Sequence, residues 1–281
     1  MYGGLKMKFG TLVRISDSNE AAGKFSQLIS NGIESCQLIY KPAVYTKEDA
    51  QIIRKAAADT GIDISAQFVG FRDSFCLWDN RFDFINAGIN SPIFGAERIE
   101  YVCSAIPFMQ ELGVTDMIIH AGHVPNNPFV DSYARMVSAV ALIGMKLKAA
   151  GLNLLFETGP ESPVSLLRLI KDAGCGNLYV NLDTGNLIMY GYGNPVDALT
   201  TIGRYVRNTH FKDGLPPTDP DRLGAEVPIG QGNVDFQKVI KLLKGLGYDR
   251  YITIEREISG SGLSDILEAI KYIKDLWYSV G

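Results

Sequence analysis

The chain has 281 residues, of which 46% are hydrophobic and 21% are charged, and its formal net charge is −4. This is the composition of a globular protein with a sizeable core, and the negative charge argues against a general nucleic-acid-binding surface, which needs clustered Lys and Arg. The four cysteines are widely spaced and form no Cys-x-x-Cys pair, so neither structural disulfides nor a zinc–thiolate site is expected.

Segments of strand and helix character alternate eight times along the chain. The predicted strands are Phe9–Ile15, Cys36–Tyr40, Ile62–Val69, Met117–His120, Asn153–Glu157, Leu178–Asp183, Val206–His210 and Tyr251–Glu255. The predicted helices are Asn19–Asn31, Lys47–Thr60, Ala96–Leu112, Val130–Ala150, Pro163–Asp172, Pro195–Ile202, Asp235–Leu246 and Ser264–Tyr278. Several of these helices are followed by glycine, which suits the left-handed position at a helix end.

Eight strand–helix units in one chain favour an α/β fold of the (β/α)8 TIM barrel type over a doubly wound sheet. No linker or low-complexity segment divides the sequence, so we expect a single domain over residues 1–281. In a barrel of this type the active site forms at the carboxyl ends of the strands and in the loops that follow them.

Four predicted strands end in a residue that can bind a metal ion. These residues are Glu157, Asp183, His210 and Glu255, at the ends of the fifth to eighth strands. Closure of the barrel places these ends side by side, and a buried carboxylate is costly unless it is paired or coordinated. Three carboxylates and one imidazole form an oxygen-rich set that suits one divalent ion, Mn²⁺ or Mg²⁺ first, with Co²⁺ and Zn²⁺ as alternatives.

Other candidate residues lie near these strand ends. His120 and His123 follow the fourth strand, and they either bind substrate hydroxyls or stabilise their loop; we favour a substrate contact for His120. Lys212 follows the proposed metal-binding histidine, where it either contacts a substrate oxygen or pairs with a carboxylate. Strand alternation directs Arg256 away from Glu255, which favours an ion pair outside the site.

Two long loops follow predicted strands. The loop Gly70–Gly95 is rich in aromatic residues, and we expect a flap over the barrel mouth. Its Trp78 either forms a wall for the apolar face of a sugar or packs the loop onto the rim. The loop Gly214–Gly232 contains Pro216 and Pro217 and is expected to be stiff and to close the opposite side.

Five motifs, read together, resemble the xylose-isomerase-like barrel superfamily, specifically its sugar phosphate isomerase/epimerase branch. They are Phe-Glu157-Thr-Gly, Asp183-Thr-Gly-Asn186-Leu, Thr-His210-Phe-Lys-Asp213-Gly, Pro-Ile-Gly-Gln-Gly-Asn-Val-Asp235-Phe and Ile-Glu255-Arg-Glu-Ile-Ser-Gly. The resemblance extends from Phe9 to about Trp277. It implies that Glu157, Asp183, His210 and Glu255 hold one divalent metal ion and that the two glutamates flank the substrate.

The resemblance also implies further contacts. Asn186 stands where many relatives carry a histidine, and it is expected to contact the substrate. The stretch that begins at Lys212 stands where ketose epimerases often carry an arginine that binds sugar hydroxyls. The DNA-repair endonucleases of the superfamily use a histidine-rich zinc cluster, and this acidic chain with three histidines does not fit that branch.

The function implied is a metal-dependent sugar or sugar phosphate isomerase or epimerase of carbohydrate metabolism. It would act through an enediolate, with Glu157 and Glu255 as acid and base. One alternative is a metal-dependent lyase or dehydratase that acts on a keto-polyol or a 3-keto-glycoside. The other is a non-enzymatic sugar-binding barrel. In each case the partner is a small sugar or polyol.

The sequence contains no apolar span of membrane length, since Lys146 and Lys148 interrupt the stretch Val137–Ala150. The amino terminus also lacks the apolar core of a signal peptide. We therefore expect a cytoplasmic protein that binds neither membranes nor nucleic acid, and assembly into a homo-oligomer is left open.

Overall fold

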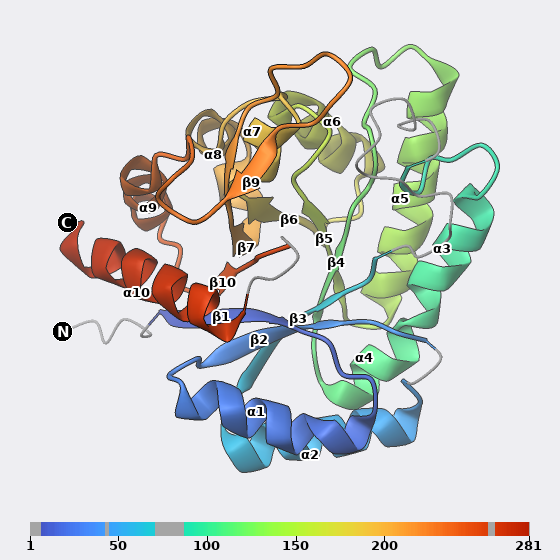
Figure 1. Cartoon of the computed structure of the whole chain (residues 1–281). Helices are drawn as coiled ribbons and strands as arrows, with labels where there is room; N and C mark the ends of the chain where they lie inside the picture. The colour runs from blue at the N-terminus through green and yellow to red at the C-terminus, as the bar shows by residue number, and fades with distance from the viewer. Residues whose placement is uncertain (1–6, 43–44, 71–86, 258–261, 281) are drawn as a thin grey trace.

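Parallel strands close into an eight-stranded barrel in the order β1-β10-β7-β6-β5-β4-β3-β2, which confirms the predicted TIM barrel (Figure 1). The computed structural model describes residues 7–42, 45–70, 87–257 and 262–280. The barrel strands are β1 Lys8–Val13, β2 Ser35–Ile39, β3 Asp63–Phe68, β4 Asp116–Ile119, β5 Asn153–Glu157, β6 Leu178–Asp183, β7 Val206–Phe211 and β10 Tyr251–Ile254.

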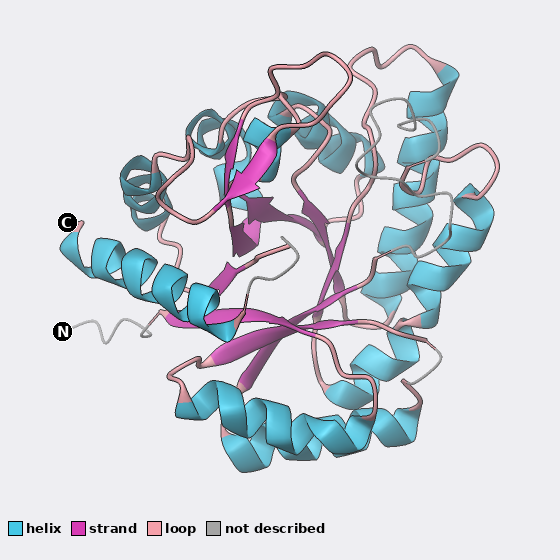
Figure 2. Cartoon of the chain, viewed as in Figure 1, coloured by secondary structure: helices cyan, strands magenta, loops and turns pink. Residues whose placement is uncertain are grey.

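Helices surround the barrel and connect its strands, as Figure 2 shows. Their bounds are η1 Ser18–Glu20, α1 Ala21–Ser30, α2 Lys47–Thr60, α3 Gly95–Ser104, α4 Ile106–Leu112, α5 Asp131–Ala149, α6 Pro163–Ala173, α7 Asn186–Met189, α8 Pro195–Ile202, η3 Gly203–Tyr205, α9 Phe236–Gly245 and α10 Leu263–Ser279. Within the described residues, no helix is both long and apolar enough to cross a membrane.

The helix predicted over Ala96–Leu112 is wrong as one element, because the structure divides it into α3 and α4. Pro107 lies in the first turn of α4. Proline has no backbone N–H to continue the ladder, and its ring collides with the carbonyl group four residues earlier, so a helix tends to restart at this residue. The predicted helix Asn19–Asn31 likewise begins with a 3-10 turn, η1, before α1.

The loop Gly214–Gly232 carries structure that was not predicted. Strands β8 Asp213–Leu215 and β9 Ala225–Val227 pair in antiparallel fashion. The carboxylate of Asp213 holds the rest of the loop in place, since it accepts hydrogen bonds from four backbone N–H groups at 2.9–3.1 Å. The donors are Gly214, Gly230, Gly232 and Val234. One buried carboxylate therefore fixes the path of this loop.

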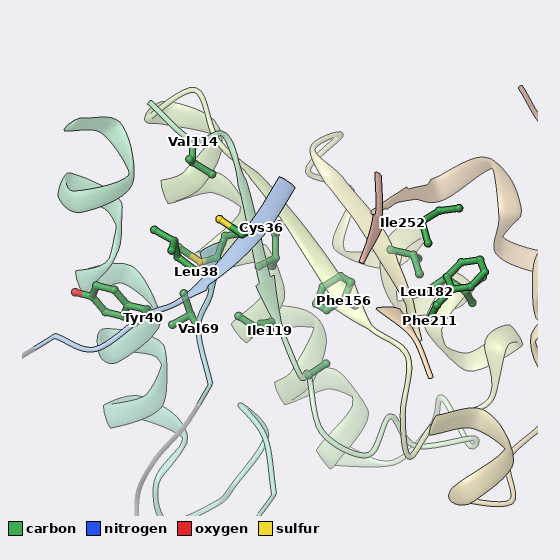
Figure 3. Close-up of a cluster of buried hydrophobic side chains, with 14 of the residues drawn as sticks. Cys36, Leu38, Tyr40, Val69, Val114, Ile119, Phe156, Leu182, Phe211 and Ile252 are labelled. Atoms are coloured by element: carbon green, nitrogen blue, oxygen red, sulfur yellow. The ribbon is translucent and has the colours of Figure 1, made fainter. Parts of the chain in front are cut away.

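Strand alternation separates the core from the candidate site. Phe156, Leu182 and Phe211 are fully buried and belong to the main hydrophobic cluster, part of which Figure 3 shows. Each is a chain neighbour of a candidate ligand, and successive side chains of a strand point to opposite faces. Packing of these apolar side chains against the surrounding helices therefore directs the ligands of β5, β6 and β7 into the barrel.

Candidate metal centre

The four predicted ligands meet inside the carboxyl end of the barrel. One ligand atom from each of Glu157, Asp183, His210 and Glu255 lies within 4.8 Å of the other three, and all four residues are buried. Strand register accounts for this, because Asp183 pairs with His210 and His210 with Thr253, two residues before Glu255. The cluster fits a metal ion, since its donor atoms come from adjacent strands and converge on one point.

The carboxylate of Asp183 has two different environments. Its Oδ1 accepts the backbone N–H groups of Gly185 and Asn186 at 2.8 and 2.7 Å, where α7 begins. Among the described residues no hydrogen bond reaches Oδ2, which lies 3.4 Å from Nζ of Lys212. A buried carboxylate oxygen without a hydrogen bond is costly, and a cation at this point would remove that cost.

The imidazole of His210 lies between the two glutamates. Its Nδ1 is 2.8 Å from Oε1 of Glu157 and 3.1 Å from Oε2 of Glu255. Burial disfavours the charged imidazole, but the carboxylates of Glu255 and Glu157 outweigh this and raise the pKa of His210 well above its usual range. Nδ1 of His210 faces the carboxylates, and this is the nitrogen that would bind a metal ion held by them.

Burial and neighbouring charge act in opposite directions on the carboxyl groups. Desolvation raises the pKa of Asp183 well above its usual value, despite the nearby ammonium group of Lys212. Desolvation also opposes ionisation of Glu255, but His210 and Lys212 outweigh it and hold the pKa of that carboxyl well below its usual value. Of these two carboxyl groups, Glu255 is therefore the one that keeps its charge more strongly.

Lys212 is enclosed by acceptors. Its Nζ lies 2.7 Å from Glu257, 2.9 Å from Glu255 and 3.3 Å from Oδ1 of Asn186. Burial lowers the pKa of a lysine, but the carboxylates, Asp183 first, raise the pKa of Lys212 well above its usual range. Of the two roles expected from the sequence, the structure supports pairing with a carboxylate, and contact with a substrate stays a prediction.

His120 and Asn186 lie beside Glu157. Nε2 of His120 is 3.0 Å from Oε2 of Glu157, and Nδ2 of Asn186 is 3.4 Å from Oε1. His123 has a different partner, since its Nδ1 hydrogen-bonds to the carbonyl group of Pro160 at 2.8 Å. Trp78 and most of the predicted flap fall within residues 71–86, which lie outside the described residues.

Arg256 points away from the cluster, as strand alternation predicted. Its guanidinium group pairs with Glu226 of β9 and with Asp265 of α10, at 2.6 and 2.7 Å. The side chains of Arg256 and Glu226 are both buried. This pairing holds the β8–β9 hairpin against the chain that leaves β10, next to Glu255.

Two residues beside the cluster were not recognised in the sequence. Oε1 of Gln37, on β2, lies 2.7 Å from Nε2 of His210. The ring of Phe68, on β3, packs 6.0 Å from that of His210 and 5.8 Å from that of His120. The only indication in the sequence was a glutamine within the otherwise apolar strand Cys36–Tyr40.

A cavity of about 470 Å³ opens beside Glu255, at the carboxyl end of the barrel. Its lining includes Leu12, Arg14, Ile39, Glu255 and Glu257. Small-molecule sites commonly have volumes of roughly 300–1,000 Å³. The cavity is therefore large enough for a monosaccharide or a cyclic polyol, and it gives Glu255 a face open to a ligand.

Comparison with known proteins establishes the family. The chain matches the xylose isomerase-like TIM barrel family over residues 25–276 and belongs to that family. The structure of a xylose isomerase domain protein from Planctomyces limnophilus aligns with 98% of this chain and 99% of its own, at a TM-score of 0.87 and 26% identity. The resemblance inferred from the motifs is thereby confirmed.

Curated relatives include two kinds of enzyme. An L-ribulose 3-epimerase from Mesorhizobium japonicum is 26% identical over 171 residues, which are 57% of this chain and 54% of the epimerase. An inosose dehydratase from Clostridium botulinum is 28% identical over 133 residues, 42% of this chain and 44% of the dehydratase. The chain spans about half the length of the curated relatives that it matches.

Proposed function

We propose that this protein is a divalent-metal-dependent sugar isomerase or epimerase. The observation that carries the proposal is the convergence of four buried ligand atoms, from Glu157, Asp183, His210 and Glu255, within 4.8 Å of one another. Membership in a family with an epimerase among its curated relatives supports the same reaction class. A sugar-binding barrel without activity would have no need of this costly buried set of charges.

The four residues of the cluster would hold the ion, and Mn²⁺ or Mg²⁺ suits their oxygen-rich donor set best. When bound, such an ion supplies Lewis-acid polarisation of a substrate carbonyl, which makes the neighbouring C–H bond more acidic. The remaining chemistry, in which a proton leaves one carbon and is returned, falls to the side chains around the cavity.

Glu255 and Glu157 are the proposed acid and base. Glu255 lines the cavity, so its carboxylate can accept a proton from a carbon atom of a bound ketose. Glu157 lies 2.8 Å from the same His210 Nδ1 that Glu255 approaches at 3.1 Å, and we propose that it acts on the opposite face of the substrate. Protonation from the second face inverts the carbon atom, and protonation at the neighbouring carbon atom moves the carbonyl group.

Substrate contacts are proposed for the polar groups that surround these glutamates. His120 lies beside Glu157, and Lys212 lies beside Glu255; we propose that both bind hydroxyl groups next to the reacting carbon. We propose the same role for Asn186, between them, and for Trp78, whose aromatic ring suits the apolar face of a sugar. We also expect the protein to act in the cytoplasm.

A second candidate is a dehydratase that acts on an inosose-type keto-polyol. The match to inosose dehydratases supports it, because dehydration begins with the same proton abstraction next to a carbonyl group. The two reactions part after that step. An epimerase returns the proton, whereas a dehydratase expels a hydroxyl group as water and leaves an unsaturated ketone.

Proton NMR in D₂O distinguishes these reactions. The protein would be loaded with Mg²⁺ for NMR detection and incubated with a panel of ketoses, inososes and 3-keto-glycosides. The proposal predicts deuterium at the reacting carbon of a ketose without loss of a leaving group, and near-complete loss of exchange in Glu255→Gln at equal metal occupancy. An unsaturated product with no ketose interconversion supports the dehydratase instead, and no reaction across the panel contradicts both.

A further inference from the structure

The two ring nitrogen atoms of His210 face opposite environments. Nδ1 is directed at three carboxylates, with Glu157 at 2.8 Å, Glu255 at 3.1 Å and Asp183 at 3.9 Å. Nε2 faces a neutral acceptor, Oε1 of Gln37, at 2.7 Å. The side chains of both His210 and Gln37 are fully buried, so this contact is shielded from bulk solvent.

The amide of Gln37 is oriented by a second contact. Its Nε2 donates to Oγ1 of Thr253 at 3.2 Å, which leaves Oε1 facing the imidazole. An amide oxygen can only accept a hydrogen bond, so this contact requires a proton on Nε2 of His210. Thr253 pairs in register with His210, and the three side chains therefore form a chain of contacts across β2, β7 and β10.

An imidazole that binds a metal ion is neutral, so only one of its two nitrogen atoms carries a proton. The acceptor at Nε2 favours a proton there, whereas Glu157 and Glu255, 2.8 and 3.1 Å from Nδ1, favour the tautomer with the proton on Nδ1. That tautomer has no lone pair on Nδ1, and the site would lose its only nitrogen ligand. With the proton held at Nε2, the Nδ1 lone pair points to the point on which the carboxylates converge.

We propose that Gln37 is a positioning residue for metal binding, which acts by accepting the Nε2–H of His210 and so keeping Nδ1 available as a ligand. The inference rests on the proposed function, because it concerns the same metal site. Gln37 contacts neither the ion nor the substrate in this account. Its effect is transmitted through the tautomer and the orientation of one imidazole ring.

The first test is Mn²⁺ affinity measured by calorimetry on the full chain. Gln37→Leu removes the acceptor at similar volume, and we expect a loss of about 10- to 100-fold, the usual effect of removing a partner of a ligating histidine. Gln37→Glu keeps an acceptor at this position and should recover most of that affinity. Thr253→Val removes the contact that orients the Gln37 amide, and it should lower Mn²⁺ affinity less than Gln37→Leu does.

The matched control is Gln67→Leu. Gln67 is also a fully buried glutamine, on the neighbouring strand β3, but its Nε2 donates to the carbonyl group of Leu38. The Gln67→Leu substitution should lower the stability of the protein without lowering its Mn²⁺ affinity. Equal losses of affinity in the Gln37 and Gln67 variants, or no recovery in Gln37→Glu, would show that Gln37 has only a packing role and would overturn the proposal.

The second test observes the proton itself. In Mg²⁺-loaded protein labelled with ¹⁵N-histidine, the Nε2–H of His210 should give a slowly exchanging signal that disappears in His210→Ala. In Gln37→Leu it should exchange faster or shift, and an unchanged signal would overturn the proposal. Failure of the wild-type protein to bind Mn²⁺ or Mg²⁺ would instead refute the metal-dependent function. In that case the metal-free NMR spectrum still decides whether Nε2 carries a proton bound to Gln37.

Discussion

Nζ of Lys212 lies 2.9 Å from Oε2 of Glu255, a residue that is also a candidate metal ligand. The same ammonium group is 3.4 Å from Oδ2 of Asp183. Lys212 therefore offsets buried negative charge when no ion is present and repels a divalent cation that binds between the carboxylates. The four-residue cluster contains three carboxylates, and Lys212 also pairs with a fourth, that of Glu257, at 2.7 Å.

Replacing Lys212 by methionine should separate these two effects. The unfolding midpoint of the metal-free protein should fall, because the buried carboxylates lose a partner, while Mn²⁺ affinity at pH 8 should rise by about tenfold or more as a nearby positive charge is removed. Calorimetry and urea titration measure the two quantities. Lys238→Met, at an exposed lysine, should change neither. Weaker Mn²⁺ binding in Lys212→Met would contradict this account of the charges.

Asp213 should contribute strongly to stability. Its carboxylate accepts four backbone N–H groups that hold the β8–β9 loop, and hydrogen bonds to a charged group are among the stronger ones. Asp213→Ala should lower the free energy of unfolding by roughly 3 kcal/mol. Urea denaturation checks this, with exposed Asp221→Ala as the control in the same loop. Equal free energies of unfolding for the two variants, within error, would refute the structural role of Asp213.

Glu161 should make stability depend on pH. Its carboxyl group is buried after β5 and accepts the N–H of Gly159, and burial raises its pKa from 4.5 to about 8. Between these values the folded protein holds a proton that the unfolded chain has released, so stability is lost as the pH rises. The loss is about 1.4 kcal/mol per pH unit in that window.

Glu161→Gln removes this linkage, since a neutral amide keeps an oxygen to accept from Gly159. Relative to the wild type, the variant should gain stability steadily from pH 5 to pH 8 in metal-free urea titrations. Glu268→Gln, at an exposed position, provides the baseline. Parallel stability curves for the wild type and Glu161→Gln would mean that the Glu161 carboxyl group is ionised in the folded state.

The barrel was predictable because each element carries a local pattern. The strand Asn153–Glu157 and the helix Pro163–Asp172 appear within a residue of their predicted ends. Both are bounded by residues with clear physical roles, such as Gly174 at a left-handed helix end. The division between α3 and α4 was also encoded locally, in Pro107, but the apolar pattern continues across it and predicts one helix.

The candidate site was predictable where chain position alone determines it. Glu157 and Asp183 end their strands, and closure of a barrel brings such ends together. Gln37 is different, because its role depends on a contact with His210 across the barrel, and no local pattern encodes that contact. The partners of Lys212 were equally non-local, since they come from two other segments of the chain, the end of β6 and the residues that follow β10.

The anomalous scattering of Mn²⁺ in crystals grown with MnCl₂ would locate the ion directly. We expect one strong peak inside the barrel, about 2.0–2.3 Å from one atom of each of Glu157, Asp183, His210 and Glu255. The peak should vanish in His210→Ala crystals grown in the same way. A wild-type crystal with no peak among these side chains, or with Mn²⁺ bound only elsewhere, would contradict the claim that this cluster is a metal centre.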